Sequence, residues 1–215
     1  MSLELLEQYI TEGDAPALDE LLAQNPALAT QTTTHNVSPL MLSCYYKKPE
    51  VSNVLLKYVG DINLFEAAAV GKFDMVAHLI FNHPDDVNNY AADGFTPLGL
   101  ACYFGQFEVA RYLVLKGADV NLPSDNGFNV FPLHSAAAGN YTDIARMLID
   151  KGAQVNIKQQ AGVTPLHSAA QNGNLELLIL LLERGADVNV RMEGGKLPAD
   201  LASAKGYTEI SEILS

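Results

Sequence analysis

Residues 162–189 read GVTPLHSAAQNGNLELLILLLERGADVN, and this stretch decides the fold because it recurs along the chain. Close copies occupy residues 94–121 (GFTPLGLACYFGQFEVARYLVLKGADVN) and 127–156 (GFNVFPLHSAAAGNYTDIARMLIDKGAQVN), and a shorter copy runs from residue 197 to residue 214. A repeat of about 33 residues is typical of a solenoid, in which successive units stack side by side. Because a solenoid offers a long continuous surface, binding is the function to expect ahead of catalysis.

Each unit carries the local signals of two short helices. Thr164 stands where an N-cap belongs, and Pro165 follows at the first helical position, where its missing N–H costs nothing. Gly173 supplies the turn between the helices, because glycine adopts a left-handed conformation without strain. The residues expected to face neighbouring units are Leu166, Ala169 and Ala170 in the first helix and Leu175, Leu178, Leu181 and Leu182 in the second.

The quoted stretches resemble ankyrin repeats, whose pattern is Gly-x-Thr-Pro-Leu-His, a helix, a glycine turn, a second helix and Gly-Ala-Asp-Val-Asn. Residues 162–189 match this pattern almost throughout, whereas Gly99 and Asp200 stand where the family has His. The resemblance implies an all-α ankyrin-repeat solenoid of antiparallel helix pairs joined by β-hairpin-like fingers. It also implies that His134 and His167 hydrogen-bond to finger backbone and play a structural part.

The turn between paired helices extends the repeat to the whole chain. It falls at Gly13, Lys47, Gly71, Gly105, Gly139, Gly173 and Gly206, so four steps are 34 residues long, one is 24 and the last is 33. Seven helix pairs therefore account for nearly all of residues 1–215, as a single domain. The short step removes about ten residues, roughly the length of one finger, so we expect the finger between pairs two and three to be missing or blunted.

This spacing suggests a division of the domain. We expect an N-terminal capping pair at 1–37, degenerate repeats at 38–62 and 63–93, well-matched repeats at 94–126, 127–159 and 160–192, and a C-terminal capping repeat at 193–215. Capping repeats give a solenoid its polar ends.

Charge is the main compositional signal. The net charge is −12, and residues 1–95 carry 13 acids and four bases. Such a field repels phosphate backbones, so nucleic acid is not expected as a partner, whereas a protein with a basic patch is. The alternative is that the acids only keep the protein in solution.

Several features favour a cytoplasmic monomer. No run approaches the ~20 apolar residues that span a bilayer, and residues 1–4 lack the features of a secretory signal, so no membrane association is expected. Cys44 and Cys102 occupy the same position two units apart, beyond disulfide reach, which favours a reducing compartment.

Residues that could carry chemistry are few. His78, His83, Asp85 and Asp86 are the only group with a metal-like composition, but the spacing of the histidines does not place them on one helix face. No phosphate-loop, dinucleotide, zinc-protease or serine-hydrolase motif is present. We therefore predict no enzyme activity, no cofactor and no metal. The side chains of Asp119, Asp187, Asn121, Asn156 and Asn189 are expected to bond local backbone in the finger turns.

The resemblance also indexes the positions with which ankyrin proteins hold partners, namely the finger tips and the end of the first helix. In this chain these positions carry aromatic residues in units two to five, and the predicted partner-binding set is Tyr45, Tyr46, Phe95, Tyr103, Phe104, Phe128 and Asn129. Large aromatic side chains are enriched in interface hot spots. The alternative is that some of these rings pack into the core or shield the short finger.

The sequence thus predicts a protein-protein interaction scaffold that holds its partner on the concave face and the finger tips. One alternative is an acidic inhibitor or immunity-like protein that blocks a basic enzyme. A small-molecule or metal-binding protein is a further alternative.

Overall fold

The computed structural model describes residues 2–215, which form seven pairs of α-helices. The pairs, numbered in chain order, are α1 (Leu3–Glu12) with α2 (Ala15–Gln24), α3 (Pro39–Tyr45) with α4 (Pro49–Tyr58), α5 (Leu64–Val70) with α6 (Phe73–Asn82), α7 (Pro97–Tyr103) with α8 (Phe107–Leu115), α9 (Pro132–Ala138) with α10 (Thr142–Asp150), α11 (Pro165–Asn172) with α12 (Leu175–Glu183), and α13 (Pro198–Ala204) with α14 (Thr208–Ile213). Three short 3-10 helices, η1 (Pro26–Thr30), η2 (Pro84–Asn88) and η3 (Gln160–Gly162), lie between pairs. The predicted all-α solenoid of helix pairs is confirmed.

The sixth pair shows how the local signals work. At the start of α11 the Thr164 N–H donates to Nδ1 of His167 at 3.2 Å and Pro165 is the first residue, while Gly173 ends the helix with a φ of 70°. Asn174 then caps α12 by accepting a hydrogen bond from the backbone N–H of Leu177 at 2.9 Å. The turn needs one residue with positive φ, and in five of the seven pairs glycine supplies it.

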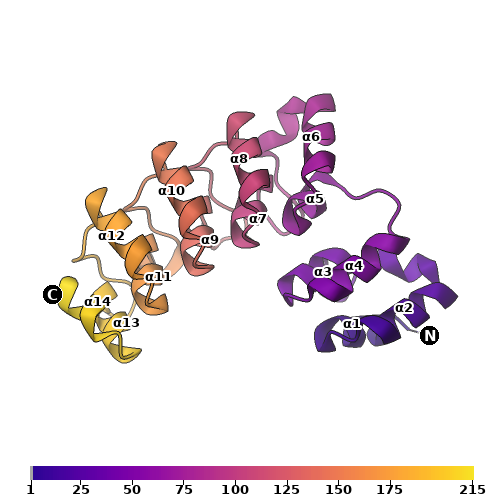
Figure 1. Ribbon diagram of the computed structural model, residues 1–215, viewed down its shortest axis with the longest axis horizontal. Coiled ribbons are helices and arrows are strands. Elements are labelled where there is room, and N and C mark those ends of the chain that lie inside the picture. The colour runs from indigo at the N-terminus through magenta and orange to yellow at the C-terminus, as the bar shows by residue number, and fades with distance from the viewer. Residues whose placement is uncertain (1) are drawn as a thin grey trace.

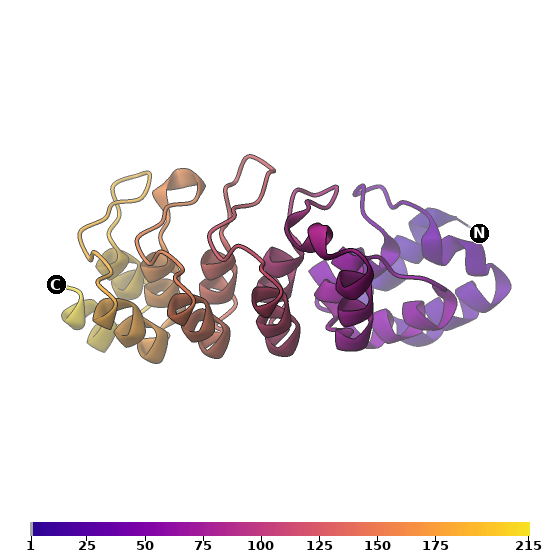
Figure 2. The same ribbon diagram turned by 90° about the horizontal axis from the view of Figure 1, so that it is seen from above.

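Stacking buries the apolar faces of the pairs in one continuous core. In Figure 1 the pairs from α5 to α14 follow one another in a row, and Figure 2 shows the loops between them rising on one side of the helices. Leu178 and Leu181 are fully buried, as expected, and so are Ala169 and Ala170 on the facing first helix. Leu175 and Leu182, which we expected in the core, are only half-buried, and Leu177 and Leu180 are buried in their place.

The loops between pairs are the fingers, and neighbouring fingers are hydrogen-bonded to each other. The finger tips are joined in sequence by the Asp125 N–H to the Gly94 carbonyl at 2.7 Å, the Gln160 N–H to the Phe128 carbonyl at 2.9 Å, and the Glu193 N–H to the Ala161 carbonyl at 2.8 Å. Each finger is also closed by its own backbone hydrogen bonds, such as that from the Ala91 N–H to the Phe95 carbonyl at 2.9 Å. No residue from 2 to 215 forms a β-strand, so the fingers are tight turns.

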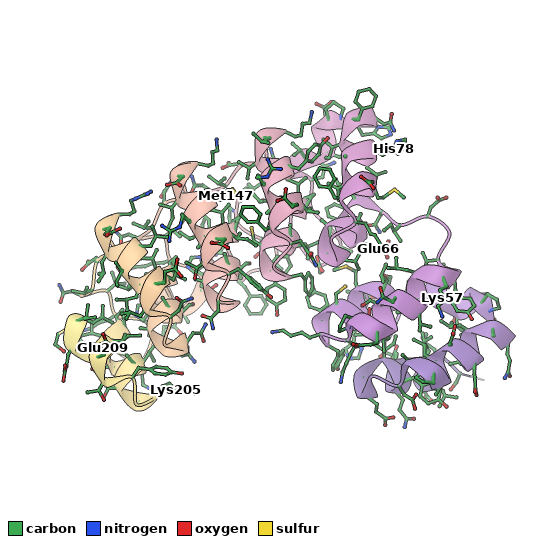
Figure 3. All side chains as sticks on the ribbon, in the orientation of Figure 1. Lys57, Glu66, His78, Met147, Lys205 and Glu209 are labelled. Atoms are coloured by element: carbon green, nitrogen blue, oxygen red, sulfur yellow. The ribbon has the colours of Figure 1, made fainter. Side chains whose placement is uncertain are left out.

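One finger is missing, as the short spacing predicts. Only residues 59–63 link α4 to α5. Asn63 therefore caps α5 directly, because its side chain accepts from the Glu66 N–H at 2.9 Å and the Glu66 carboxylate accepts from the Asn63 N–H at 3.0 Å. The other oxygen of Glu66 accepts the Ser38 hydroxyl at 2.5 Å, which ties pair three to the start of α3. Figure 3 places Glu66 on the part of α5 that lies beside pair two.

Asn121 and Asn156, at the ends of pairs four and five, link successive units, so our expectation of local bonding was wrong for them, and the side chain of Asn189 makes no hydrogen bond among residues 2–215. Asn156 donates to the Gly185 carbonyl at 2.8 Å and accepts from the Asp187 N–H at 2.8 Å, both in the next unit. Asn121 and Asn88 make the same pair of bonds one and two units earlier, respectively. The sequence alone does not reveal these bonds between units, because in many loops an asparagine side chain hydrogen-bonds to backbone groups close to it in the chain.

The aspartates of the same turns bond locally, as expected. Asp119 accepts from the Asn121 N–H at 2.8 Å, and Asp187 accepts from the Asn189 N–H at the same distance. The two histidines also take the structural position that the resemblance implies. Nε2 of His134 lies 2.9 Å from the Val163 carbonyl, and Nε2 of His167 lies 3.4 Å from the Lys196 carbonyl.

Without its finger, the junction of pairs two and three is packed differently from the others. Helix α3 packs on α5, but α4 and α6 scarcely meet. Figure 1 shows helices α1 to α4 set apart from the row that begins at α5, with the linker crossing between them. The second helices of these two pairs are therefore not packed on each other.

Candidate partner-binding surface

Four of the seven predicted binding residues meet in one aromatic cluster, which consists of Tyr45, Phe95, Tyr103 and Phe104. The Tyr103 ring is the centre of the cluster, with its centroid 6.0 Å from Tyr45, 6.2 Å from Phe95 and 5.0 Å from Phe104. Tyr45 and Phe104 are 5.3 Å apart. These separations and the tilted or edge-on geometries are those that aromatic pairs prefer.

The elements that carry the cluster belong to different pairs. Tyr45 ends α3 in pair two, Tyr103 ends α7 in pair four, and Phe95 belongs to the finger between pairs three and four. We call the surface that the first helices and the fingers make together the concave face. The aromatic cluster lies on this face, where the missing finger brings pair two close to the finger of pair four.

A hydrogen bond fixes Tyr45 across that gap. Its hydroxyl donates to Oδ2 of Asp93 at 2.6 Å, and Oδ1 of Asp93 accepts from the Phe95 N–H at 3.2 Å. Burial, together with the carboxylate of Asp93, raises the pKa of Tyr45. The phenol therefore stays protonated and holds the finger of pair four against α3.

One side of the cluster packs on apolar residues, and the other side is exposed to solvent. Beneath it lies a small second core of Met41, Ala69 and Leu100, on which Tyr45, Phe95 and Phe104 pack with half-buried rings. Tyr103 is 37% exposed and forms the accessible top of the cluster. Three of the rings thus serve packing as well as surface, in line with the alternative that some of them shield the short finger.

The other three predicted residues lie apart from this cluster. Tyr46 is 42% exposed and its ring stands edge-on to His35 at 6.5 Å. Phe128 is 58% exposed at the finger tip between pairs four and five, and Asn129 beside it has a φ of 51°. The concave face therefore carries one aromatic cluster and two separate exposed rings, rather than a single continuous set.

Groups that could hold a metal ion do not converge in the described part of the chain. Among residues 2–215, no set of three or more His, Cys, Asp or Glu side chains is placed to hold a metal ion. Burial raises the pKa of Cys44 to about 12, so its thiol is not ionised near neutral pH. Burial also lowers the pKa of His134 to about 4, so that its imidazole is neutral. These groups are structural in character.

The sequence belongs to a known family of repeats. The family model described as "Ankyrin repeats (3 copies)" matches residues 64–159 and 133–215, which together make up most of the chain. The chain belongs to the ankyrin-repeat family. Ankyrin repeats generally mediate protein–protein interaction.

Curated relatives of this ankyrin-repeat chain match parts of longer proteins. "Probable 26S proteasome regulatory subunit p28" of Saccharomyces cerevisiae is 30% identical over 152 residues, which cover 64% of this chain and 65% of the relative. "Alpha-latrocrustotoxin-Lt1a" of Latrodectus tredecimguttatus is 32% identical over 137 residues, which cover 58% of this chain and 10% of the toxin. "Neurogenic locus notch homolog protein 1" of Homo sapiens is 31% identical over 145 residues, 61% of this chain and 6% of that protein. The chain thus spans less than two thirds of each of these relatives.

Within residues 2–215, every helix is too short to cross a bilayer.

The junction of pairs two and three also holds a cleft of about 510 Å³ that reaches Tyr103 and Phe104. This cleft was not predicted from the sequence. Its only signal was the short step of 24 residues between turns.

Proposed function

We propose that this ankyrin-repeat domain is a non-enzymatic scaffold that binds another protein on its concave face and finger tips, in the cytoplasm and as a monomer. The observation that carries the proposal is the aromatic cluster with its exposed centre, Tyr103. A tyrosine whose ring is held by three others pays little conformational entropy on binding, and such side chains dominate interface energetics.

The finger tips add a second contact point. Phe128 is 58% exposed on a tip whose own carbonyl is held by the next finger. An aromatic ring on a tethered loop is available to a partner that lies along the fingers. The predicted set of Tyr45, Tyr46, Phe95, Tyr103, Phe104, Phe128 and Asn129 stays our proposal for the contact residues, with Tyr103 and Phe128 expected to contribute most.

The charge distribution of the domain supports a partner with a basic patch. Residues 1–95 carry 13 acids against four bases, so the N-terminal half of the domain attracts a basic patch on a protein. Because exposed charges are screened by salt, this contribution is expected to fall as ionic strength rises.

The test is affinity capture with matched variants. Tyr103→Ala/Phe128→Ala removes two of the three exposed rings of the concave face, and Phe81→Ala removes a ring that is 81% exposed on the second helix α6. We expect the double variant to lose proteins that the unaltered domain captures, and Phe81→Ala to retain them. Retention of all captured proteins by the double variant would argue against the concave face as the binding surface.

A further inference from the structure

The junction of pairs two and three contains a cleft that reaches the aromatic cluster. It encloses about 510 Å³ between the turn of pair two and the turn of pair three. Its apolar wall includes Leu56, Val70 and Tyr141, and it reaches Tyr103 and Phe104 of the aromatic cluster. A volume of this kind accommodates two or three side chains of a bound segment.

At four of the other five junctions, the residue after the turn of one pair lies over the turn of the preceding pair. Lys48 lies over Gly13, Gln106 over Gly71, Tyr141 over Gly105 and Tyr207 over Gly173. The Gln106 amide also donates to the Ala69 carbonyl at 3.0 Å. Gln106 and Tyr141 of this set also line the cleft.

At the open junction the equivalent residues are both lysines. Lys72 follows the turn of pair three, and Lys47 is the turn residue of pair two. Both line the cleft and both are exposed. Within residues 2–215, neither side chain makes an ion pair or a hydrogen bond, so two ammonium groups border the cleft without a protein partner.

The local charge of the cleft is opposite to that of the protein around it. The first 95 residues contain four bases, and three of them, Lys47, Lys48 and Lys72, line the cleft. The fourth, Lys57, is paired with Asp19 at 2.8 Å. Lys48 donates to the Glu12 carbonyl at 3.3 Å. No Asp or Glu contributes to the wall of the cleft in the described part of the chain.

The backbone at Lys47 adds a separate observation. Its φ is 54°, in the left-handed region where five other turns have glycine and one has Asn140. A lysine in this conformation costs about 1 kcal/mol or more, and such strain is found at functional positions. The chain therefore has a lysine at the rim of the cleft, at a position where glycine would form the turn with less strain.

We propose that this cleft binds an acidic segment of a partner protein, with an apolar side chain between the aromatic walls and carboxylates against Lys47 and Lys72. The occupant follows from charge complementarity, since the cleft is a basic, aromatic site in an acidic protein. This inference rests on the proposed protein-binding function and gives it a second determinant beside the concave face.

The probe is a fluorescein-labelled peptide, Glu-Asp-Glu-Leu-Phe-Glu-Asp-Glu, titrated with the whole domain by fluorescence anisotropy. Its analogue has every acid replaced by the matching amide. We expect the analogue to bind about tenfold more weakly, and Lys47→Glu/Lys72→Glu to weaken the acidic peptide by about tenfold, since each of the two exposed ion pairs contributes up to roughly half of that on a logarithmic scale.

The matched control is Lys151→Glu/Lys205→Glu, which makes the same charge change at exposed lysines far from the cleft. It should leave the affinity within about twofold, apart from general repulsion. Circular dichroism checks that both double variants fold. Equal affinity for the two peptides, or equal weakening by the two double variants, would overturn the proposal. Displacement by inorganic phosphate, but not by chloride at equal ionic strength, would assign the cleft to a small anion and also overturn it.

The two proposals fail separately. Phe128 lies outside the cleft, so Phe128→Ala is measured in both assays. If captured proteins depend on Phe128 while the peptide ignores the lysines, only the cleft proposal fails. If the peptide needs the lysines while no captured protein depends on Phe128 or Tyr103, the concave-face proposal fails.

Discussion

Glu66 is the residue whose removal tests our account of the missing finger. It is 7% exposed, and its carboxylate accepts two hydrogen bonds, from the Ser38 hydroxyl at 2.5 Å and from the Asn63 N–H at 3.0 Å. The first bond joins pair three to pair two, and the second closes the cap of α5. Glu66→Ala removes both bonds and leaves the Ser38 hydroxyl without its acceptor.

The magnitude follows from these two bonds. Loss of half a capping interaction costs about 1 kcal/mol, and loss of a hydrogen bond to a carboxylate costs about 1.5–3 kcal/mol. Burial of a carboxylate is itself unfavourable, and the alanine variant removes that cost, which offsets part of the loss from the two hydrogen bonds. We therefore expect Glu66→Ala to lower the free energy of unfolding by about 2–4 kcal/mol. The matched control is Asp200→Ala, which removes the same cap contact at exposed α13, where Asp200 accepts from the Leu197 N–H at 2.8 Å, and costs about 1 kcal/mol or less.

The assay combines urea unfolding, followed by circular dichroism, with hydrogen exchange measured by mass spectrometry. Because repeat proteins open locally, exchange locates the effect. Faster exchange is expected in residues 38–70 and unchanged exchange in residues 164–214. A double-mutant cycle of Glu66→Ala with Ser38→Ala should give a coupling of about 1–2 kcal/mol. A loss below about 0.5 kcal/mol, or exchange that rises evenly along the chain, would refute the reasoning.

Three further predictions concern the well-matched repeats. Leu178→Ala should lower the free energy of unfolding by about 2–5 kcal/mol in urea titrations, because the side chain is fully buried; full stability would show that the site collapses around alanine. Asn156→Ala removes two bonds to the next unit, at Gly185 and Asp187, and should cost about 1–3 kcal/mol in the same titrations. Asn189→Ala is its control, because that side chain makes no hydrogen bond among residues 2–215, and an equal loss in both would contradict a link between units. Burial lowers the pKa of His134 to about 4, so its contribution is complete above the unfolded pKa of about 6.5 and is lost as pH falls from there towards 4, by up to roughly 3 kcal/mol. Thermal melts across this pH range should show a shallower slope for His134→Gln, and an unchanged slope would mean that other groups cause it.

The repeat signals determined most of the fold in advance because they are local. Thr164-Pro165 begins a helix and Gly173 ends it through the immediate backbone, so a reader of the sequence can place them without knowing the neighbours. The loss of a finger was visible for the same reason, since it is a count of residues between turns. The division into capping and internal repeats stays a prediction.

The binding surface was harder to foresee because it depends on contacts between distant residues. The Tyr45 hydroxyl reaches Asp93, 48 positions away, and no pattern along the chain specifies that bond. The same holds for Asn156, whose local sequence suits a turn but whose partners lie in the next unit. Phe128 was grouped with the other rings because repeat numbering ignores how far one finger tip stands from another.

The absent finger explains both what holds the junction together and what it leaves open. A finger at residues 59–63 would extend the row of tip-to-tip hydrogen bonds, and Asn63 would be free to link units as Asn88 does. Without it, Asn63 is used as a cap, and Glu66 and Tyr45 provide the remaining ties across pairs two to four. All of these ties lie on the side of the first helices. The second helices, α4 and α6, have none, so the space between the turns stays open. It follows that inserting a finger of about ten residues after Gly60 should close the cleft and weaken the acidic peptide, whereas the lysines would remain in place. That separates the shape of the site from its charge.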